Sequence, residues 1–201
     1  MKYRDMKQAV KLLDKEWNLG KREAETISDI CAWIYLMQIL EETEQFIYYR
    51  KNGELLGFAG YSKINSKRHR FKKKFYTFVK NRLYKSKKIK NLDALHEYEK
   101  NYDYMPEDMK KRFDGEISII IIDSCLRGKG IGKKLLSDIF DLAKKDNIKN
   151  LSIYTDDSCG YYIYESLDCK RIYETTVENK EPRKLGSVFK EQAYIYSKKL
   201  N

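Results

Sequence analysis

The stretch that determines the fold is EISIIIIDSCLRGKGIGKKLL, residues 116–136, in which an apolar run, a glycine-rich turn and a helical pattern follow one another. Residues Glu116–Asp123 are rich in isoleucine, which is β-branched and gives the extended chain apolar side chains on both faces. They predict a strand that is covered on both sides. From about Ile131 to Lys145 the apolar residues recur on one stripe, as in an amphipathic helix. The sequence therefore predicts a buried strand joined to a helix by a tight turn.

The turn Arg127–Gly132 has glycine at the alternating positions 128, 130 and 132. Without Cβ atoms the backbone can turn tightly and direct its amides outward at the start of the helix, where unsatisfied N–H groups and the helix dipole attract phosphate. Four basic side chains surround the turn: Arg127, Lys129, Lys133 and Lys134. The G-x-G-x-G spacing fits neither a P-loop nor the dinucleotide fingerprint. The alternative is a plain strand-to-helix turn whose glycines bind nothing.

The remaining elements follow from hydrophobic periodicity. Helices are expected at Asp5–Trp17, Glu23–Glu42 and Gly160–Leu167, and strands at Gln45–Arg50, Glu54–Tyr61, Asn150–Thr155, Cys169–Thr176 and Ser187–Leu200. The pair Asn52-Gly53 is typical of a type I′ hairpin turn. The alternation of strands and helices, which ends in an antiparallel pair, indicates one mixed α/β domain over residues 1–201.

Residues of about 62–114 are expected to be an insertion in this domain. Between Tyr61 and Leu92 there are 13 Lys/Arg and no Asp/Glu, whereas the rest of the chain has 28 basic and 30 acidic residues. Phe71, Phe75 and Phe78 recur at helical spacing and predict a basic amphipathic helix, and a short helix is expected at Asp93–Lys100. Three roles stay open for the basic helix: contact with RNA or a ribosomal surface, contact with an anionic membrane, or packing of its phenylalanines on the core.

Composition excludes several classes of site. The four cysteines form no CxxC pair, and with only two histidines no zinc spacing can be assembled, so no metal is expected. Nothing after Met1 resembles a signal peptide, and no apolar run approaches the roughly 18 residues of a membrane span. We expect reduced thiols and a cytoplasmic protein. The sequence gives no indication of the oligomeric state.

The segment Arg127–Gly132 resembles the Q/R-x-x-G-x-G/A signature of the Gcn5-related N-acetyltransferases (GNAT), and the resemblance extends over about Asp114–Tyr173. It implies a mostly antiparallel sheet with one splayed parallel pair, flanking helices, and acetyl-CoA as co-substrate. The strand backbone near Ile120 and Ile122 would pair with the pantetheine arm. The pyrophosphate would be bound by the backbone amides of seven consecutive residues: Arg127, Gly128, Lys129, Gly130, Ile131, Gly132 and Lys133.

A second block, YYIYESLDC at residues 161–169, is similar to a helix and strand start of the same family. The resemblance assigns Tyr164 to the tyrosine that protonates the departing thiolate. Asp168 stands where the family usually has glycine, and aspartate tolerates a left-handed backbone better than most residues. Asp157 stands where an asparagine often contacts the cofactor. Packing of Tyr164 in the core remains the alternative to a catalytic role.

Glu116 resembles in position the glutamate that acts as general base in the histone-acetylating branch of the family. A solvated carboxylate at the end of the strand is the competing interpretation. Asp156 and Asp157 are reserve candidates, and an ordered water is another. Asp123 is less suitable, because it sits at the cofactor turn.

The leading hypothesis is transfer of acetyl from acetyl-CoA to a primary amine by direct attack in a ternary complex. The acceptor is a small cationic amine or a protein amine, and the acidic stretch from Asp93 to Glu116 favours a cation. The alternative is a CoA-fold binding module that docks on RNA or an anionic surface through Lys67–Lys90.

Overall fold

The computed structural model describes residues 1–17, 30–64, 66, 70–87, 89, 104–180 and 188–200. Two of the expected features lie wholly or partly outside these residues. They are the first turns of the helix at Glu23–Glu42 and the short helix at Asp93–Lys100.

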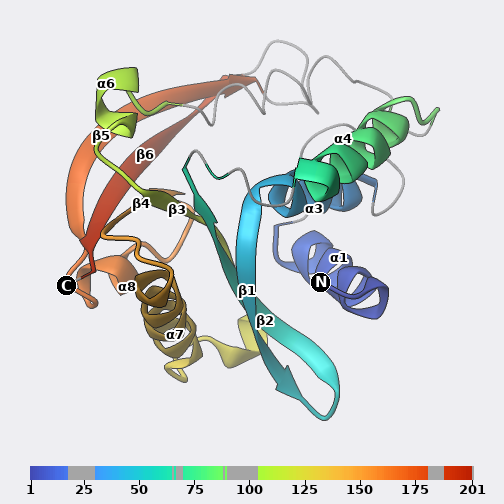
Figure 1. The fold of residues 1–201 in the computed structure, drawn as a ribbon, viewed down its shortest axis with the longest axis horizontal. Coiled ribbons are helices and arrows are strands. Elements are labelled where there is room, and N and C mark those ends of the chain that lie inside the picture. The colour runs from blue at the N-terminus through green and yellow to red at the C-terminus, as the bar shows by residue number, and fades with distance from the viewer. Residues whose placement is uncertain are drawn as a thin grey trace.

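Six strands form one sheet in the order β1-β2-β3-β4-β6-β5 (Figure 1). The strands are β1 (Thr43–Lys51), β2 (Glu54–Lys63), β3 (Gly115–Ile122), β4 (Asn150–Asp156), β5 (Lys170–Lys180) and β6 (Val188–Lys199). Every neighbouring pair is antiparallel except β3 and β4, which are parallel. The expected fold, a mostly antiparallel sheet with one parallel pair, is confirmed.

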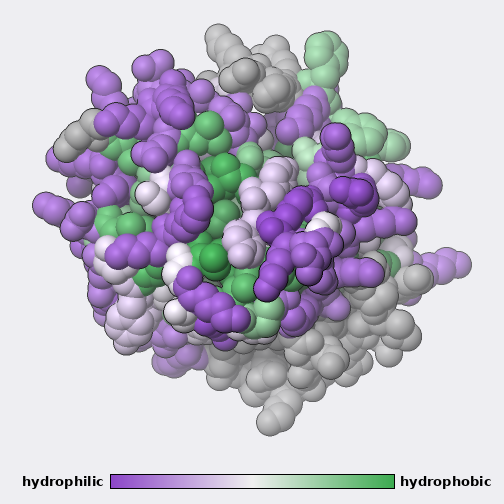
Figure 2. Space-filling model, turned by 90° about the horizontal axis from the view of Figure 1, so that it is seen from below, coloured by the Kyte–Doolittle hydropathy of each residue, from purple (hydrophilic) through white to green (hydrophobic). Residues whose placement is uncertain are grey.

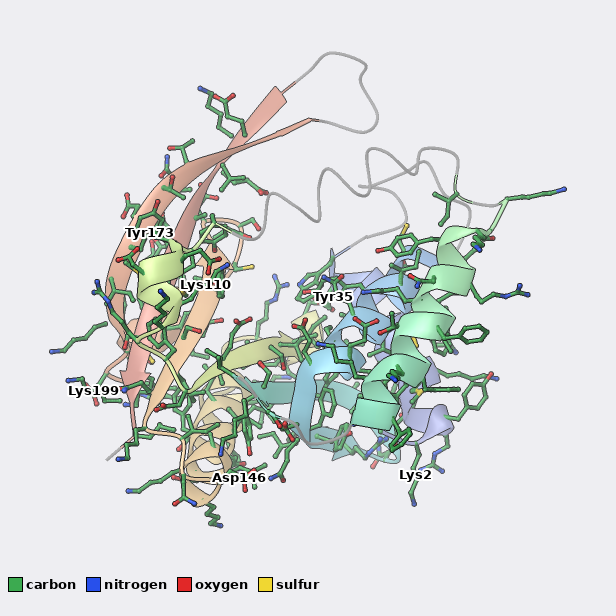
Figure 3. All side chains as sticks on the ribbon, turned by 45° about the horizontal axis from the view of Figure 1, so that its top comes forward. Lys2, Tyr35, Lys110, Asp146, Tyr173 and Lys199 are labelled. Carbon is green, nitrogen blue, oxygen red and sulfur yellow. The ribbon has the colours of Figure 1, made fainter. Side chains whose placement is uncertain are left out.

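Helices cover both faces of this sheet. On one face α1 (Tyr3–Trp17), α3 (Ile30–Glu42) and α4 (Arg70–Tyr84) gather beside β1 and β2, while α7 (Ile131–Lys145) and α8 (Tyr162–Glu165) cover the other (Figure 1). The short helix α6 (Glu107–Lys110) lies over the end of the sheet formed by β5 and β6. Figure 3 shows Lys110 of α6 close to Tyr173 of β5, and Tyr35 of α3 nearer the middle of the view.

The two tight turns have the backbone that the sequence predicts. Asn52 and Gly53 both have positive φ, 51° and 81°, which is the type I′ geometry that lets β1 and β2 pair without splaying. Asp168 has φ 56°, so it adopts the left-handed conformation in place of glycine before β5. None of the helices in the described part of the chain is long and apolar enough to cross a membrane.

Strand β3 is buried on both faces because its isoleucines alternate between two cores. Ile119 and Ile121 pack with α1 and α3, whereas Ile117 packs with α7. The alternation is offset at Ser118, because Gly60 pairs with Ile119 and Tyr61 with Ile117, which leaves Ser118 as an extra residue. Such a β-bulge re-aims the strand, and here it lies near the centre of the sheet.

One of the three roles considered for the basic helix, packing of its phenylalanines on the core, can be tested from the exposure of these side chains. Phe71, Phe75 and Phe78 are 90%, 60% and 65% exposed, so the prediction that they pack on the core is wrong. The helix is held instead by an adjacent side, where Tyr76 is buried and Val79 and Leu83 contact the core under α3. Because β2 and β3 are adjacent in the sheet, residues 64–114 leave and return between two neighbouring strands. We propose that they are the insertion.

Candidate active site

The site is built around an opening between β3 and β4. The two strands pair only at their beginnings, Gly115–Ile117 with Leu151–Ile153. Beyond that point β3 continues to pair with β2, and β4 continues to pair with β6. The inner edges of β3 and β4 are therefore not paired with each other over their second halves, so backbone groups that a sheet would satisfy face the opening.

Ile120 and Ile122 are the residues of β3 whose backbone faces this opening. The amide of Asp123 donates to the Leu56 carbonyl at 2.8 Å on the β2 side. Backbone groups alternate in direction along a strand, so Ile122 and Ile120 direct theirs to the other side, toward β4. These two residues were expected to pair with a pantetheine arm, and their backbone groups face the opening between β3 and β4.

The glycine turn follows at the end of the opening. Gly128 and Gly130 have φ 75° and 74°, values that residues with a Cβ rarely adopt. Gly132 is needed for a different reason, because a Cβ there would lie 2.8 Å from Ile122 Cδ1 and 2.9 Å from Ile163 Cδ1. The start of α7 therefore approaches β3 and α8 closely, which places the helix N-terminus at the end of the opening.

Five amides of this turn have no backbone partner among the described residues: Gly128, Gly130, Ile131, Gly132 and Lys133. The last three are the first turn of α7, whose N–H groups have no intrahelical acceptor. The amides of Arg127 and Lys129 donate to Ser124 and Leu126 carbonyls at 3.1 and 3.2 Å. Of the seven amides expected to bind the pyrophosphate, those of Arg127 and Lys129 are therefore used within the turn, and the other five have no backbone partner among the described residues.

The basic side chains around the turn are only partly available to a ligand. The Lys129 ammonium donates to the Cys125 carbonyl at 2.8 Å, and Lys134 pairs with Asp138 at 2.6 Å. The Arg127 guanidinium lies 3.2 Å from Glu16 of α1. Lys133 is exposed. The charges of Arg127 and Lys134 are therefore offset by carboxylates, whereas Lys129 and Lys133 form no ion pair with a described residue.

Residues of α1 fix the segment before the turn, which sequence reasoning missed. Glu16 accepts the amide of Ser124 at 2.8 Å, and Lys15 donates to the buried Asp123 carboxylate at 2.6 Å. Asp123 also accepts the Cys125 amide, and these hydrogen bonds lower its pKa to about 2. Asp123 is therefore a structural anion and a poor base. No sequence pattern links α1 to this segment, since the contacts span more than 100 residues.

Tyr164 lies on α8 with its side chain buried in the core beneath α7, where its ring centroid is 5.4 Å from that of Tyr196. Burial raises the pKa of its hydroxyl well above the ordinary value, and the neighbouring Cys159 adds to this. The nearby Thr155 hydroxyl lowers the pKa of Tyr164 somewhat, which offsets part of this rise. Its oxygen is buried and makes no hydrogen bond of standard geometry with any described residue. Tyr164 thus carries its proton at neutral pH next to the second half of β4.

A cluster around Arg171 holds α8 in place. The guanidinium donates to Glu165 at 2.8 Å and to the Tyr196 hydroxyl at 3.1 Å, and it lies 4.3 Å from the ring centroid of Tyr194. Tyr196 in turn donates to Glu165 at 2.8 Å. These contacts tie α8 to β5 and β6, so they position Tyr164. The residues are scattered in sequence, and no motif predicted the cluster.

Glu116 lies on the face of the sheet opposite to Tyr164. Its neighbour Ile117 packs beneath α7, so Glu116 points the other way, toward Tyr104. The Tyr104 hydroxyl donates to the Thr155 and Tyr194 carbonyls at 3.0 and 3.2 Å. Burial is the main cause that raises the pKa of Tyr104, and the charges of Asp156 and Glu116 contribute. Tyr104 was not singled out in the sequence, where it is one of 17 tyrosines.

The reserve carboxylates have other contacts. Asp156 accepts the amides of Ser158 and Cys159 at 2.8 and 3.1 Å and so caps the turn after β4. Asp157 is exposed, and its amide donates to the Gln192 carbonyl at 3.0 Å. It lies at the end of β4 beside the opening, where the predicted cofactor contact would be. No group of His, Cys, Asp or Glu in the described residues is arranged to hold a metal ion.

Figure 2 shows the molecule from below, the side on which Figure 1 places α7 and the turn that precedes it. Hydrophobic residues are visible there in a hollow between two hydrophilic areas. A surface of this kind suits a ligand that has both an apolar arm and an anionic part.

Comparisons with known proteins agree with this geometry. The sequence model of the acetyltransferase (GNAT) family matches residues 6–162. No curated protein matches the sequence significantly.

Solved structures of N-acetyltransferases share the fold over the whole chain. An N-acetyltransferase from Staphylococcus aureus Mu50 is 15% identical with a TM-score of 0.58, and the match covers 100% of this chain and 96% of that one. The ribosomal-protein-alanine N-acetyltransferase from Brucella melitensis is 11% identical with a TM-score of 0.56, covering 100% and 97%. The ribosomal-protein-S18-alanine N-acetyltransferase from Escherichia coli is 15% identical with a TM-score of 0.52, covering 100% and 91%.

Proposed function

The chain belongs to the GNAT acetyltransferase family, which uses acetyl-CoA, and we propose that it transfers the acetyl group to a primary amine by direct attack in a ternary complex. One observation carries the proposal. The parallel pair β3–β4 separates after three residues and leads to a helix N-terminus whose amides have no backbone partner among the described residues. The opening suits an extended arm, and the amides suit its pyrophosphate.

Each part of the donor then has a protein partner. The amides of Gly128 and of residues 130–133 bind the pyrophosphate, and the backbone of Ile120 and Ile122 pairs with the pantetheine arm. The thioester supplies an activated carbonyl when acetyl-CoA is bound. Backbone N–H groups on the unpaired edge of β3 stabilise the oxyanion that develops there.

Two side chains move protons. Tyr164 is kept protonated by burial, so it can give its proton to the departing thiolate. Glu116 lies across the sheet beside Tyr104 and accepts a proton from the attacking amine, directly or through one water. Acid and base on opposite faces fit an acceptor that approaches from the side of α6 while the donor enters from the side of α7.

The kind of amine that would be acetylated follows from the side chains on the face of the sheet that carries Glu116. The carboxylates of Glu116 and Asp156 both lie near enough to the Tyr104 hydroxyl to contribute to its raised pKa, of which burial is the main cause. Carboxylates and an aromatic ring favour a cationic amine over an anionic or neutral acceptor. Both a small polyamine and a lysine or N-terminus of a protein satisfy this condition.

A thiol-release assay with acetyl-CoA tests the proposal. The amine panel should include a polyamine, an aminoglycoside, a lysine peptide and a peptide with N-terminal alanine. We expect turnover with at least one cationic amine. CoA binding without turnover on any amine would instead favour a binding module that docks through the basic helix.

Tyr164→Phe tests the acid. It should lower kcat by roughly a hundredfold, because general acid catalysis contributes about 10²–10⁴, and leave the affinity for CoA unchanged. Tyr76→Phe is the matched control, since it removes the hydroxyl of another buried tyrosine, which packs in the separate core beside α3. Equal loss of kcat in both variants would assign Tyr164 a packing role.

A further inference from the structure

Helix α4 has two apolar faces, and only one of them is used inside the molecule. Tyr76 is 7% exposed, and Val79 and Leu83 pack on the core beside α3. Lys80 pairs with Glu41 of α3 at 2.8 Å, and their side chains are only 18% and 7% exposed. These contacts fix which side of α4 faces inward, so the helix cannot turn its other face to the core.

The other face carries Phe71, Phe75 and Phe78. At about 100° per residue the three rings fall within roughly 60° of the helix circumference, along about 10 Å of its length. Among phenylalanines whose side chains the structure describes, all the exposed ones lie on this helix. Figure 3 shows side chains of α4 projecting away from α3. Exposed apolar groups that gather in this way on a surface mark a contact with something else.

Positive charge surrounds this phenylalanine stripe (Phe71, Phe75 and Phe78). Lys74 lies next to it on the helix, Arg82 continues it by one turn, and both are exposed. Lys85 and Lys87 follow just after the helix and are also exposed. No Asp or Glu occurs between Tyr61 and Leu92. The occupant of this surface must therefore be anionic where it meets the lysines and apolar where it meets the rings.

We propose that α4 docks on the surface of an anionic lipid bilayer, with the phenylalanine stripe inserted and the surrounding cations on the headgroups. Helices with a narrow aromatic face and a basic surround lie in the interface in this way. RNA fits less well, because aromatic rings that stack on bases are usually presented flat on a sheet or in a loop. Rings that project side by side from a helix form a wedge. The inference does not depend on the acetyl transfer.

Vesicle co-sedimentation of the full chain tests the proposal. We expect binding to vesicles of phosphatidylcholine mixed with phosphatidylglycerol and little binding to phosphatidylcholine alone. The triple variant Phe71→Ser/Phe75→Ser/Phe78→Ser should bind at least about tenfold more weakly, because each ring adds apolar burial. Ile172→Ser, at a residue of β5 that is 38% exposed, is the matched control and should bind like the wild type.

A second measurement distinguishes a bilayer from RNA. The tryptophan in Phe75→Trp should show a blue-shifted emission on anionic vesicles, relative to the wild type with its own two tryptophans. Single-stranded polyuridylate should give no such shift and should bind equally well to the triple serine variant. Absence of vesicle binding, or RNA binding that is tighter and depends on the phenylalanines, would overturn the proposal. CoA affinity of the variants, which should be unchanged, verifies that they fold.

Discussion

Helices α4 and α7 are both 15 residues long and rich in lysine, yet they use their apolar residues in opposite ways. In α7 the stripe that contains Leu136 and Ile139 is completely buried on the sheet. In α4 the more regular stripe, that of the phenylalanines, faces solvent. The difference shows that periodicity identifies an apolar face but does not say what covers it. The two helices also differ in the groups that we propose bind an anion, which are backbone amides in α7 and side chains in α4.

The largest contrast should be in stability. Leu136→Ala in α7 removes a fully buried side chain and should lower the free energy of unfolding by about 3 kcal/mol through lost burial and a cavity. Phe75→Ala in α4 removes an exposed ring and should change it by less than about 0.5 kcal/mol. Urea unfolding measures both. A similar loss for the two variants would mean that the stripe on α4 is covered within the molecule.

The way each helix is anchored gives the next contrast. Lys80→Met leaves the buried Glu41 carboxylate without its lysine, which should cost about 2 kcal/mol of unfolding free energy. Lys134→Met in α7 breaks an exposed pair with Asp138 and should cost less than about 0.5 kcal/mol. If the two substitutions cost the same in urea unfolding, α4 is not held to α3 by this ion pair.

Backbone binding at α7 can be tested with two glycines that have the same strain. Gly130→Ala and Gly53→Ala both place a Cβ where φ is positive, 74° and 81°, with no atom within 4 Å. Both should lose stability by roughly 1–2 kcal/mol. Only Gly130→Ala should also weaken CoA binding, by roughly tenfold, since it disturbs amides that face the anion. Calorimetric titration with CoA gives the affinities, and unchanged affinity in Gly130→Ala would refute the role of the turn.

The smallest effect concerns pH and the segment that leads into α7. The pKa of Asp123 is lowered to about 2 from 3.8, so its ionised form stabilises the fold above about pH 4. That contribution is lost as the pH falls through about 2. Asp123→Asn should therefore be less stable than the wild type by roughly 1 kcal/mol at neutral pH, and the difference should vanish in acid. Asp138→Asn, an exposed carboxylate of α7, is the control and should show little difference at any pH.

Sequence reasoning succeeded where local chemistry dominates. The bounds of α7 were predicted at Ile131–Lys145, because glycines end the turn before it and the apolar stripe is continuous. Asn52-Gly53 and Asp168 have the backbone that their residue types allow. The opening beside β3 followed from the family signature, and the pairing of the strands agrees with it.

Prediction from the sequence failed where contacts join segments that are distant along the chain. The contacts of Lys15 and Glu16 with the segment before α7 leave no periodic trace, and neither do those of Tyr104 with β4 and β6. In α4 the residues Tyr76, Val79 and Leu83 form a second apolar stripe that is less regular but is the one buried. Helical spacing alone cannot choose between two such stripes, because the choice depends on the surface of α3.

The three paired residues that join β3 to β4 have a mechanical consequence. They are the only ladder that joins two half-sheets of the described chain, β1-β2-β3 and β4-β6-β5, whose own strands are paired over most of their length. Acetyl-CoA lying in the opening would take the place of a strand and connect the two half-sheets. Amide protons of Ile120 and Ile122 should then exchange slowly with solvent in the presence of CoA and quickly without it, so the substrate would complete the sheet that the chain leaves unfinished.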